Sequence, residues 1–391
     1  MKVLHLVSVF ARSASDPEVP WLRTLLLELA ARGHESIVVA PSWKGLASHE
    51  IDGLRVERFR YAPADLEILT HDEGAPNKLA RRPWLQLLAV PYILSGAWRT
   101  FRLAWREKPD LIHVHWPFPH ALCALPTVWL LRVPMVTHFY LAELLLRRKF
   151  PFVTPFLSLA IRASTRVVAI SRFTASQVRG IRAAEIEIIP YGGASRPAGD
   201  VVPPPPEGRP VILFVGRHVE RKGIPVLIEA MSHLRCEADL VICGHGDQTP
   251  ALKALAAASP AADRIRFAGR VGAEELSGLY AGCTVFCLPS ITDSRGDTEG
   301  LGTVPLEAYA HGRPVVCAAS GGIPDVVVEG ETGFLVPPGD ALALAGALDG
   351  LLADPALAAR MGEAGRQLVL GPFSWPRIAE RIESVWRSAA T

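Results

Sequence analysis

Cysteine pairs, long hydrophobic runs and a strong net charge are all missing from this 391-residue sequence. None of its six cysteines belongs to a C-x-x-C pair, which argues against a metal site and fits a reducing compartment. The uncharged run Pro83–Trp98 is too short to span a bilayer core of about 30 Å. A net charge of +2 does not favour a nucleic-acid partner, and none is expected.

Signatures of other protein classes are lacking as well. No G-x-G-x-x-G follows the first apolar run, so a nicotinamide-dependent dehydrogenase is disfavoured. No Asp-x-Asp stands at the end of an expected strand, so a metal on a diphosphate substrate is not expected. The N-terminus resembles a short signal peptide, but its apolar stretch carries His5 and Ser8, and we interpret it as a first buried strand.

Charge is distributed unevenly along the chain. Residues 1–200 carry 25 Lys and Arg against 17 Asp and Glu, whereas the remainder carries 16 against 22. Three stretches of the first half, 81–84, 98–106 and 144–152, interleave arginine with aromatic or aliphatic residues. An anionic membrane surface is therefore an expected partner. The alternative is that these stretches form helices packed on a sheet, with snorkelling arginines and scattered surface charge.

The length suits two domains, and short strand-like runs alternate with helical ones in both halves. This rhythm predicts an α/β protein with two doubly wound, Rossmann-like parallel sheets. The expected first helix is Pro20–Arg32, and the expected strands are Val3–Phe10, Ser36–Ala40, Asp110–His115, Pro134–His138, Val167–Ile170, Val211–Val215, Asp239–Cys243, Ile265–Phe267, Val285–Leu288 and Pro314–Ala318.

Four consecutive prolines at 203–206 interrupt the rhythm between the halves, because proline suits neither a helix interior nor a central strand. We predict an N-terminal domain at 1–194, a linker at 195–210, a C-terminal domain at 211–372 and a final helix at 373–391 that crosses back to the first domain. Ligands of such sheets bind beyond the carboxyl ends of the strands, so a nucleotide is expected in a cleft between the domains.

A glycine-rich turn carries the strongest chemical signal. Residues 299–308 read EGLGTVPLEA, and a helix is expected to begin at Val304 or Pro305, since proline suits the first helical turn. Free backbone N–H groups and the positive end of a helix would accept phosphate there. Glu299 and Glu307 flank this loop, one placed for sugar hydroxyls and the other for ribose hydroxyls. A simple turn and helix cap is the alternative.

A second loop directly follows an expected strand. Residues 214–223 read FVGRHVERKG, in which Gly216 permits a tight turn. Arg217 and Lys222 can converge on a pyrophosphate, the arginine as a planar fork and the lysine as a point charge. A charged surface loop is the alternative.

Together these two loops resemble the retaining family-4 glycosyltransferases. The resemblance rests on the Gly-Arg loop that ends in Lys222 and Gly223, on the spacing of Glu299 and Glu307, and on AYAHGRPVV at 308–316. Further matches are GHG at 244–246, FAGRV at 267–271 and GETGFLV at 330–336, so the resemblance covers the second half from end to end.

This resemblance implies the GT-B fold, with a UDP- or GDP-sugar donor on the C-terminal domain and an acceptor on the N-terminal domain. It also implies retention of anomeric configuration, no cofactor and no required metal. Arg217 and Lys222 would stabilise the departing diphosphate, Glu299 would hold the sugar, and Glu307 the ribose. The other implied donor-binding residues are Gly216, Gly244, Gly246, Val271, Gly300, Leu301, Gly302 and Thr303.

The first half resembles the family less closely. His138, at the end of an expected strand, stands where members often carry an active-site histidine; a structural histidine is the alternative. Members usually carry a glycine-rich loop after the first strand, but residues 10–17 contain no glycine here. The expected acceptor-side loop residues are Arg12, Ser13, Ala14 and Ser15.

We therefore expect a hexosyltransferase that acts on a lipid-linked or saccharide acceptor in the synthesis of a cell-envelope polysaccharide or glycolipid. A cytoplasmic location, peripheral on the inner face of the cell membrane, is expected. One alternative is another GT-B enzyme, such as a nucleotide-sugar epimerase or a phosphorylase. The other is a donor-binding subunit that acts with a partner.

Overall fold

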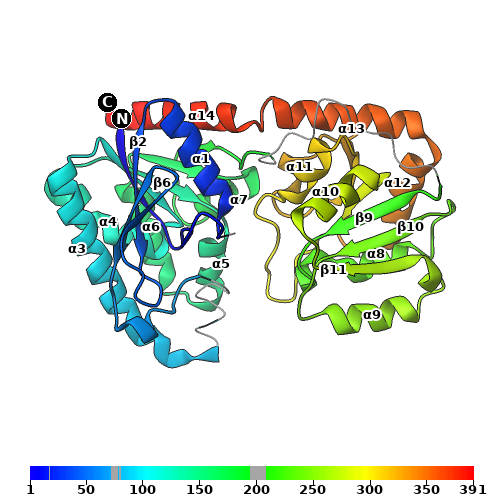
Figure 1. Ribbon diagram of the computed structural model, residues 1–391, viewed down its shortest axis with the longest axis horizontal. Helices are drawn as coiled ribbons and strands as arrows, with labels where there is room; N and C mark the ends of the chain where they lie inside the picture. Colours follow the sequence, from blue (N-terminus) through cyan, green and yellow to red (C-terminus); the bar gives the residue numbers. More distant parts are fainter. Residues whose placement is uncertain (17, 72–77, 79–80, 194–207) are drawn as a thin grey trace. The chain divides into compact units, whose positions relative to one another are not determined.

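The computed structural model describes residues 1–16, 18–71, 78, 81–193 and 208–391. They form two compact units: unit 1 contains Met1–Pro190 and Trp375–Thr391, and unit 2 contains Tyr191–Ser374 (Figure 1). The final helix thus belongs to unit 1. Residues 195–207 of the predicted linker 195–210 lie outside the described part of the chain.

Unit 1 contains an eight-stranded sheet with the order β3-β4-β2-β1-β5-β6-β7-β8. All neighbours are parallel except β3 and β4, which pair antiparallel at the edge. The chain leaves β1 on one side toward β2 and returns on the other side at β5, so the order reverses at β1. The strands are β1 (Lys2–Leu6), β2 (Glu35–Pro41), β3 (His49–Ile51), β4 (Leu54–Phe59), β5 (Leu111–His115), β6 (Met135–Phe139), β7 (Arg166–Ala169) and β8 (Ile186–Ile188).

Helices cover both faces of this sheet because its strands are apolar on both sides. Val3 packs in one buried cluster with α1 and α14, whereas its neighbour Leu4 packs in another with α3 and α4. Trp386 of α14 is fully buried and donates a hydrogen bond from its indole N–H to His113 Nδ1 at 3.2 Å. The helices are α1 (Pro20–Ala31), α3 (Ala89–Glu107), α4 (Pro117–Leu131), α5 (Ala142–Lys149), α6 (Val153–Ala163), α7 (Arg172–Arg179) and α14 (Trp375–Ala390), with short 3-10 turns η1 (Ala64–Leu66) and η2 (Pro83–Leu88).

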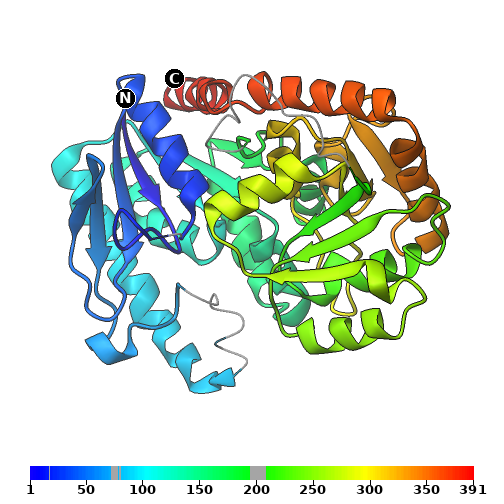
Figure 2. The ribbon, with the colours of Figure 1, turned by 45° about the vertical axis from the view of Figure 1, so that its right-hand side comes forward.

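Unit 2 contains a six-stranded, wholly parallel sheet with the order β11-β10-β9-β12-β13-β14. Figure 2 shows helices on both of its sides. The order reverses between β9 and β12, which is where ligands of open α/β sheets usually bind. The strands are β9 (Val211–Val215), β10 (Asp239–Cys243), β11 (Ile265–Gly269), β12 (Val285–Leu288), β13 (Val315–Ala318) and β14 (Gly333–Val336).

The last two helices of unit 2, with 13 and 16 residues, are longer than the others. Asp340 and Asp354 cap the long helices α12 and α13 by accepting hydrogen bonds from backbone N–H groups of the first turn. The elements are α8 (Ile224–Ala230), α9 (Thr249–Ala257), α10 (Ala273–Gly282), α11 (Val304–Ala310), α12 (Ala341–Ala353) and α13 (Pro355–Leu370), with 3-10 turns η3 (Glu220–Lys222), η4 (Ala262–Arg264) and η5 (Ile323–Asp325).

The predicted parallel sheets are confirmed, and the expected strands lie within a few residues of those observed. Four strands, β3, β4, β8 and β14, were not predicted, and among the expected strands the largest difference is the first, which ends at Leu6 rather than Phe10. After Val7 donates its N–H to Val39, the chain leaves the sheet and becomes a loop. All six cysteines are free thiols, and five of them are buried. Among the described residues, no single helix is both long and apolar enough to cross a membrane.

Candidate functional site

Four loops of unit 2 carry the predicted donor-binding residues. Gly216 follows β9, Gly244 follows β10 and Val271 follows β11, while residues 299–303 connect β12 to α11. These four strands are neighbours in one parallel sheet, so their carboxyl ends lie at the same edge. The fold of unit 2 therefore brings these segments, far apart in the sequence, to one place.

Two of the glycines allow loops from neighbouring strands to touch. A Cβ on Gly244, whose φ is +131°, would lie 1.9 Å from the carbonyl oxygen of Gly216. A Cβ on Gly246 would lie 2.2 Å from the carbonyl oxygen of His218. Any larger residue would force the β9 and β10 loops apart. The close packing of the backbone around the site therefore explains why glycine stands at these two positions.

The charged centre of the site consists of Lys222, Arg221 and Glu299. Lys222 and Glu299 are each 6% exposed, and the Lys222 ammonium lies 2.9 Å from Glu299 Oε1. The Arg221 guanidinium also binds this carboxylate, and Ser290 donates a hydrogen bond to it at 3.3 Å. The turn η3 places Arg221 and Lys222 side by side in the sequence, and both reach the same oxygen. One carboxylate thus holds two cations in place.

Electrostatics keep this carboxylate ionised. Burial by itself raises the pKa of Glu299, but the positive charges of Lys222 and Arg221 outweigh it and hold the pKa below its usual value. Arg221 also pairs with Asp297, at 3.6 Å, so the two cations of this cluster face two carboxylates. Further positive charge for an anionic ligand comes from Arg217 of the same loop.

Arg217 and the backbone after Glu299 supply further anion-binding groups. Arg217 is exposed, and its side chain forms no ion pair with any described residue. The backbone N–H groups of Leu301, Gly302 and Thr303 donate to no acceptor within the described ranges. Lys222 lies close to Gly216, since a Cβ built there would be 3.4 Å from its Cε. Donors from both predicted loops are therefore available to a phosphate group.

Glu307 lies in the first turn of α11, as predicted, and is oriented by a tyrosine. The Tyr280 hydroxyl donates a hydrogen bond to Glu307 Oε2 at 2.8 Å, and the Tyr280 ring stacks on His311. Burial raises the pKa of Glu307 more than the hydrogen bond from Tyr280 lowers it. The carboxyl group can accept hydrogen bonds from hydroxyl groups of a ligand.

In unit 1, the glycine-free loop after β1 is ordered by ionic contacts. The Arg12 side chain and backbone N–H both bind Asp16, at 2.6 and 2.8 Å. This hydrogen bonding from Arg12 lowers the pKa of Asp16 to about 2. The buried Arg58 guanidinium binds the carbonyl oxygens of Phe10 and Ala11 at 3.0 and 2.8 Å. Ser13, Ala14 and Ser15 remain exposed at the tip of the loop.

His138 belongs to a stack of aromatic rings at the ends of β1, β5 and β6. Its ring lies 4.5 Å from that of Tyr140 and 5.6 Å from that of His113. Burial lowers the pKa of His138 well below its usual value, and the neighbouring His113 lowers it further. The imidazole is therefore neutral near pH 7 and can accept or donate one hydrogen bond at each nitrogen.

The described residues contain one group of side chains close enough together to hold a metal ion: His5, His113 and His115. Both nitrogens of His115 are already hydrogen-bonded, Nε2 to His5 Nδ1 at 3.2 Å and Nδ1 to the Tyr140 hydroxyl at 2.7 Å, whereas His5 Nε2 and His113 Nε2 have no partner among the described residues. A neutral imidazole has one donor and one acceptor nitrogen, so a metal ion on His115 would displace one of these partners. We interpret the three histidines as parts of a hydrogen-bonded core.

The structure thus brings Lys222 together with Glu299, leaves Arg217 at the surface and places His138 in a neutral ring stack in the other unit. Sequence reasoning missed Arg221, Tyr280 and Asp16, which bind predicted site residues. Arg221 stands directly before Lys222 in the sequence, so it was visible as a basic neighbour. Nothing local in the sequence indicates the partners of Tyr280.

Two family models match consecutive parts of the chain. Residues 21–192 match the model described as Glycosyltransferase Family 4, and residues 196–368 match Glycosyl transferases group 1. The chain is 40% identical over 178 residues to a GDP-mannose-dependent alpha-(1-6)-phosphatidylinositol monomannoside mannosyltransferase of Mycolicibacterium smegmatis, which covers 44% of this chain and 47% of that protein. It is 29% identical to a glycogen synthase of Mycobacterium tuberculosis over 92% of this chain and 88% of that protein.

Among the curated relatives that it matches at 34–40% identity, the chain spans about half of their length. Among solved structures, sucrose-phosphate synthase of Thermosynechococcus elongatus superposes with a TM-score of 0.75 at 23% identity, over 99% of this chain and 98% of that one. This likeness shows a GT-B fold. Because the two family models between them account for both units, the chain belongs to the family-4 glycosyltransferases.

Proposed function

We propose that this protein transfers a hexosyl unit from a UDP- or GDP-sugar to a lipid-linked or saccharide acceptor, with retention of anomeric configuration. The observation that carries this proposal is the buried cluster of Lys222, Arg221 and Glu299 beside the free N–H groups of residues 301–303. The cationic groups of Lys222, Arg221 and the nearby Arg217, together with the place of the cluster at the carboxyl ends of the strands, suit the diphosphate of a nucleotide sugar.

The proposed reaction breaks the bond between the anomeric carbon and the diphosphate oxygen while the acceptor oxygen attacks from the same face. The proton of the acceptor hydroxyl passes to the departing phosphate, so no protein nucleophile is required. Negative charge grows on the diphosphate as the bond breaks, and Lys222 and Arg217 would stabilise it. A preorganised donor of this kind contributes about 3–4 kcal/mol to lowering the barrier. Glu299 would hold the sugar, and Glu307 the ribose.

We propose that the reaction needs neither a metal ion nor a cofactor. Lys222, Arg217 and Arg221 provide cationic groups that can neutralise a diphosphate as a divalent ion does in other transferases. Turnover should therefore survive treatment with EDTA. A loss of turnover with EDTA that is reversed by Mn²⁺ or Mg²⁺ would contradict this part of the proposal.

Unit 1 is proposed to carry the acceptor, with His138 and Arg12–Ser15 near its reacting hydroxyl. A neutral His138 can accept a hydrogen bond from that hydroxyl without holding a charge of its own. The mannosyltransferase relative acts on a phosphatidylinositol monomannoside, by its name, which supports a lipid acceptor and a cell-envelope product here.

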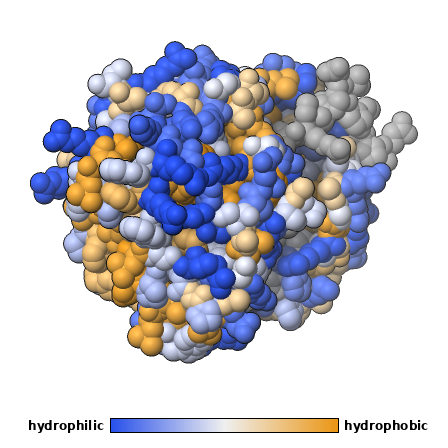
Figure 3. Space-filling view, turned by 60° about the vertical axis from the view of Figure 1, so that its left-hand side comes forward, coloured by the Kyte–Doolittle hydropathy of each residue, from blue (hydrophilic) through white to orange (hydrophobic). Residues whose placement is uncertain are grey.

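We also propose that unit 1 rests on an anionic membrane from the cytoplasmic side. One face of α3 exposes a stripe of Val90, Leu94, Trp98 and Trp105, and Trp98 and Trp105 are 64% and 68% exposed. The exposed Arg102 lies on the same helix. On the face of the molecule shown in Figure 3, hydrophobic residues alternate with hydrophilic ones. Tryptophan and arginine together favour the lipid headgroup region.

The test of the transferase proposal begins with binding of nucleoside diphosphates to the full chain. UDP or GDP at 100 times its Kd should stabilise the protein by about 2.7 kcal/mol in thermal unfolding. Lys222→Ala should abolish most of this gain, whereas Lys253→Ala, at an exposed lysine of the same unit, should not.

Transfer is then followed by NMR of the new glycosidic bond, which reports its anomeric configuration. Inversion of configuration would contradict the retaining mechanism. Epimerisation of the donor without transfer to any acceptor would contradict the transferase assignment. Activity that appears only with a second protein would favour the donor-binding subunit.

A further inference from the structure

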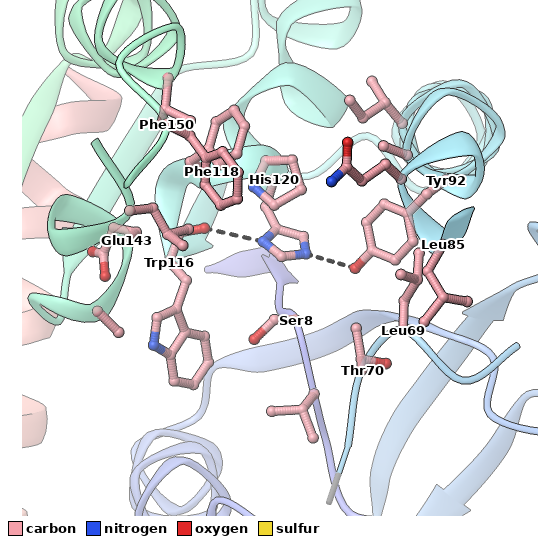
Figure 4. Close-up of a pocket in the computed structure, with 18 of the residues that line it drawn as sticks. Ser8, Leu69, Thr70, Leu85, Tyr92, Trp116, Phe118, His120, Glu143 and Phe150 are labelled. Carbon is pink, nitrogen blue, oxygen red and sulfur yellow. Dashed lines mark hydrogen bonds between the residues drawn. The ribbon is translucent and has the colours of Figure 1, made fainter. Parts of the chain in front are cut away.

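A cavity of about 510 Å³ lies within unit 1. None of the residues that line it has a role in the reaction proposed above. Its walls come from the loop after β1, from η2 and α3, from the start of α4 and from α5 and α6. Figure 4 shows Leu69, Leu85 and Tyr92 on one side and Phe118, Phe150 and Trp116 on the other. A volume of this size matches that of small-molecule sites.

Two of the polar side chains in the walls, His120 and Tyr92, are hydrogen-bonded to each other. His120 Nδ1 donates to the Trp116 carbonyl oxygen at 3.0 Å, and the Tyr92 hydroxyl donates to His120 Nε2 at 2.9 Å (Figure 4). Burial lowers the pKa of His120 to about 4, so the ring is uncharged. The cavity therefore has little to offer to the many hydroxyl groups of a saccharide, which would lose their hydrogen bonds to water there.

Glu143 is a buried carboxyl group in the same wall. Glu143 is only 2% exposed. One of its carboxyl oxygens accepts a hydrogen bond from the Tyr140 N–H at 2.7 Å. The other oxygen, Oε2, has no hydrogen-bond partner among the described residues. Burial raises the pKa of Glu143 to about 7, so a neutral carboxyl group is available near that pH. A neutral carboxyl group is compatible with a hydrocarbon neighbour.

The position of the cavity ties it to the acceptor side. Ser8 and Val9 form part of its wall and lead directly into the loop that contains Arg12. Phe152, which also lines the cavity, is exposed, so the cavity is open to solvent there. A ligand chain in the cavity would thus end beside the proposed acceptor loop.

A cationic hollow adjoins this cavity. It measures about 400 Å³, and Leu85 belongs to the walls of both. Its described walls contain four basic residues and one acidic residue, which favours an anionic group: Lys44, Lys78, Arg81, Arg82 and Asp65. Lys44 and Lys78 lie over the Trp43 ring, 5.2 and 4.6 Å from its centroid.

We propose that the cavity binds the hydrocarbon chain of an anionic lipid acceptor, whose charged headgroup lies at the adjoining cationic hollow. This inference rests on the proposed transferase function and narrows its acceptor to a lipid with a single chain in unit 1. Tyr92 and the phenylalanines contact the chain and exclude water from it. Lys78 donates three hydrogen bonds to the carbonyl oxygens of Ile68, Thr70 and His71 and adds only its charge. The headgroup is recognised by the other basic residues of the hollow, Lys44, Arg81 and Arg82.

The probes are hexyl, octyl and decyl phosphate, titrated calorimetrically into the full chain below their micellar concentrations. Each added pair of methylenes should tighten binding about fifteenfold, which corresponds to about 0.8 kcal/mol per methylene. Inorganic phosphate alone should bind far more weakly than decyl phosphate. Decyl trimethylammonium, with the same chain and the opposite charge, should also bind more weakly.

Ala142→Phe tests the cavity itself. Ala142 is exposed at the first turn of α5 and lines the cavity, so a phenylalanine there would fill it without disturbing the core. We expect at least a tenfold loss of decyl phosphate affinity. The matched control is Ala30→Phe, at an exposed helical alanine of unit 1 that does not line the cavity, and it should bind like the wild type.

An affinity that does not change with chain length, or an Ala142→Phe variant that binds decyl phosphate normally, would overturn the inference. The chain-length series uses the unaltered protein, so it decides the matter even if the variant does not fold. Nucleoside diphosphate binding without alkyl phosphate binding would remove only this inference. Alkyl phosphate binding without nucleotide-sugar binding would instead contradict the proposed transferase.

Discussion

Replacement of Glu299 by glutamine should separate the charge of the donor site from its shape. Glutamine has the same size and keeps an oxygen for Ser290, but it leaves the Lys222 ammonium buried without a carboxylate beside it. Removal of one partner from a buried ion pair costs about 3–5 kcal/mol. Because Arg221 is partly exposed and can be solvated, we expect a loss in unfolding free energy near the lower limit, about 3 kcal/mol.

A bound diphosphate would supply the missing negative charge. The stability difference between Glu299→Gln and the wild type should therefore shrink when UDP or GDP is saturating. Urea unfolding with and without the nucleotide measures this difference. Calorimetric titration should show diphosphate binding at least as tight as in the wild type, while sugar transfer falls because Glu299 is proposed to hold the sugar.

The control is a double-mutant cycle with Lys222→Met. If the ion pair carries the effect, the double variant should be less destabilised than the sum of the single variants, by about 1–3 kcal/mol. A Glu299→Gln protein as stable as the wild type within about 0.5 kcal/mol would refute the electrostatic argument. A folded variant that no longer binds diphosphate would refute the separation of roles.

Three further predictions concern other parts of the molecule. Glu307→Ala should chiefly raise the donor KM with little change in kcat, since ribose contacts are the same in the ground and transition states; an unchanged KM would contradict this role. Trp98→Ser with Trp105→Ser should weaken sedimentation with anionic liposomes, and wild-type binding should fall with salt; equal binding to neutral vesicles would refute it. Because burial raises the pKa of Glu143 to about 7, the folded state binds the extra proton and this group costs stability as the pH rises from about 4.5 through 7. Glu143→Gln should therefore be more stable than the wild type above pH 7 by about 3 kcal/mol and gain nothing near pH 4, as measured by urea unfolding.

Local patterns were sufficient to predict the sheets and the donor loops. Strands such as Val211–Val215 and Asp239–Cys243 are short apolar runs bounded by turn residues, and parallel strands buried on both faces leave few alternatives. Residues 299–308 predicted a loop and a helix start because proline and glycine constrain the backbone locally. The family resemblance rests on the same short stretches.

The partners of the side chains were decided only by the tertiary structure. The sequence offers two arginines before Lys222, and the turn at 220–222 directs Arg221, not Arg217, onto Glu299 across 78 residues of chain. The edge hairpin of β3 and β4 depends in the same way on pairing with β2.

The same reason explains the loop after β1 and the cavity of unit 1. The loop has no glycine, yet Arg58 from β4 binds its carbonyl groups and holds it in place. The cavity walls range from Ser8 to Val153, and no local pattern marks them, because each residue alone would suit an ordinary core. The sequence by itself determined the elements and the chemical character of the donor loops. Only the packing of distant segments decided which charges meet and where unit 1 leaves apolar space, because such contacts depend on positions that local propensity does not set.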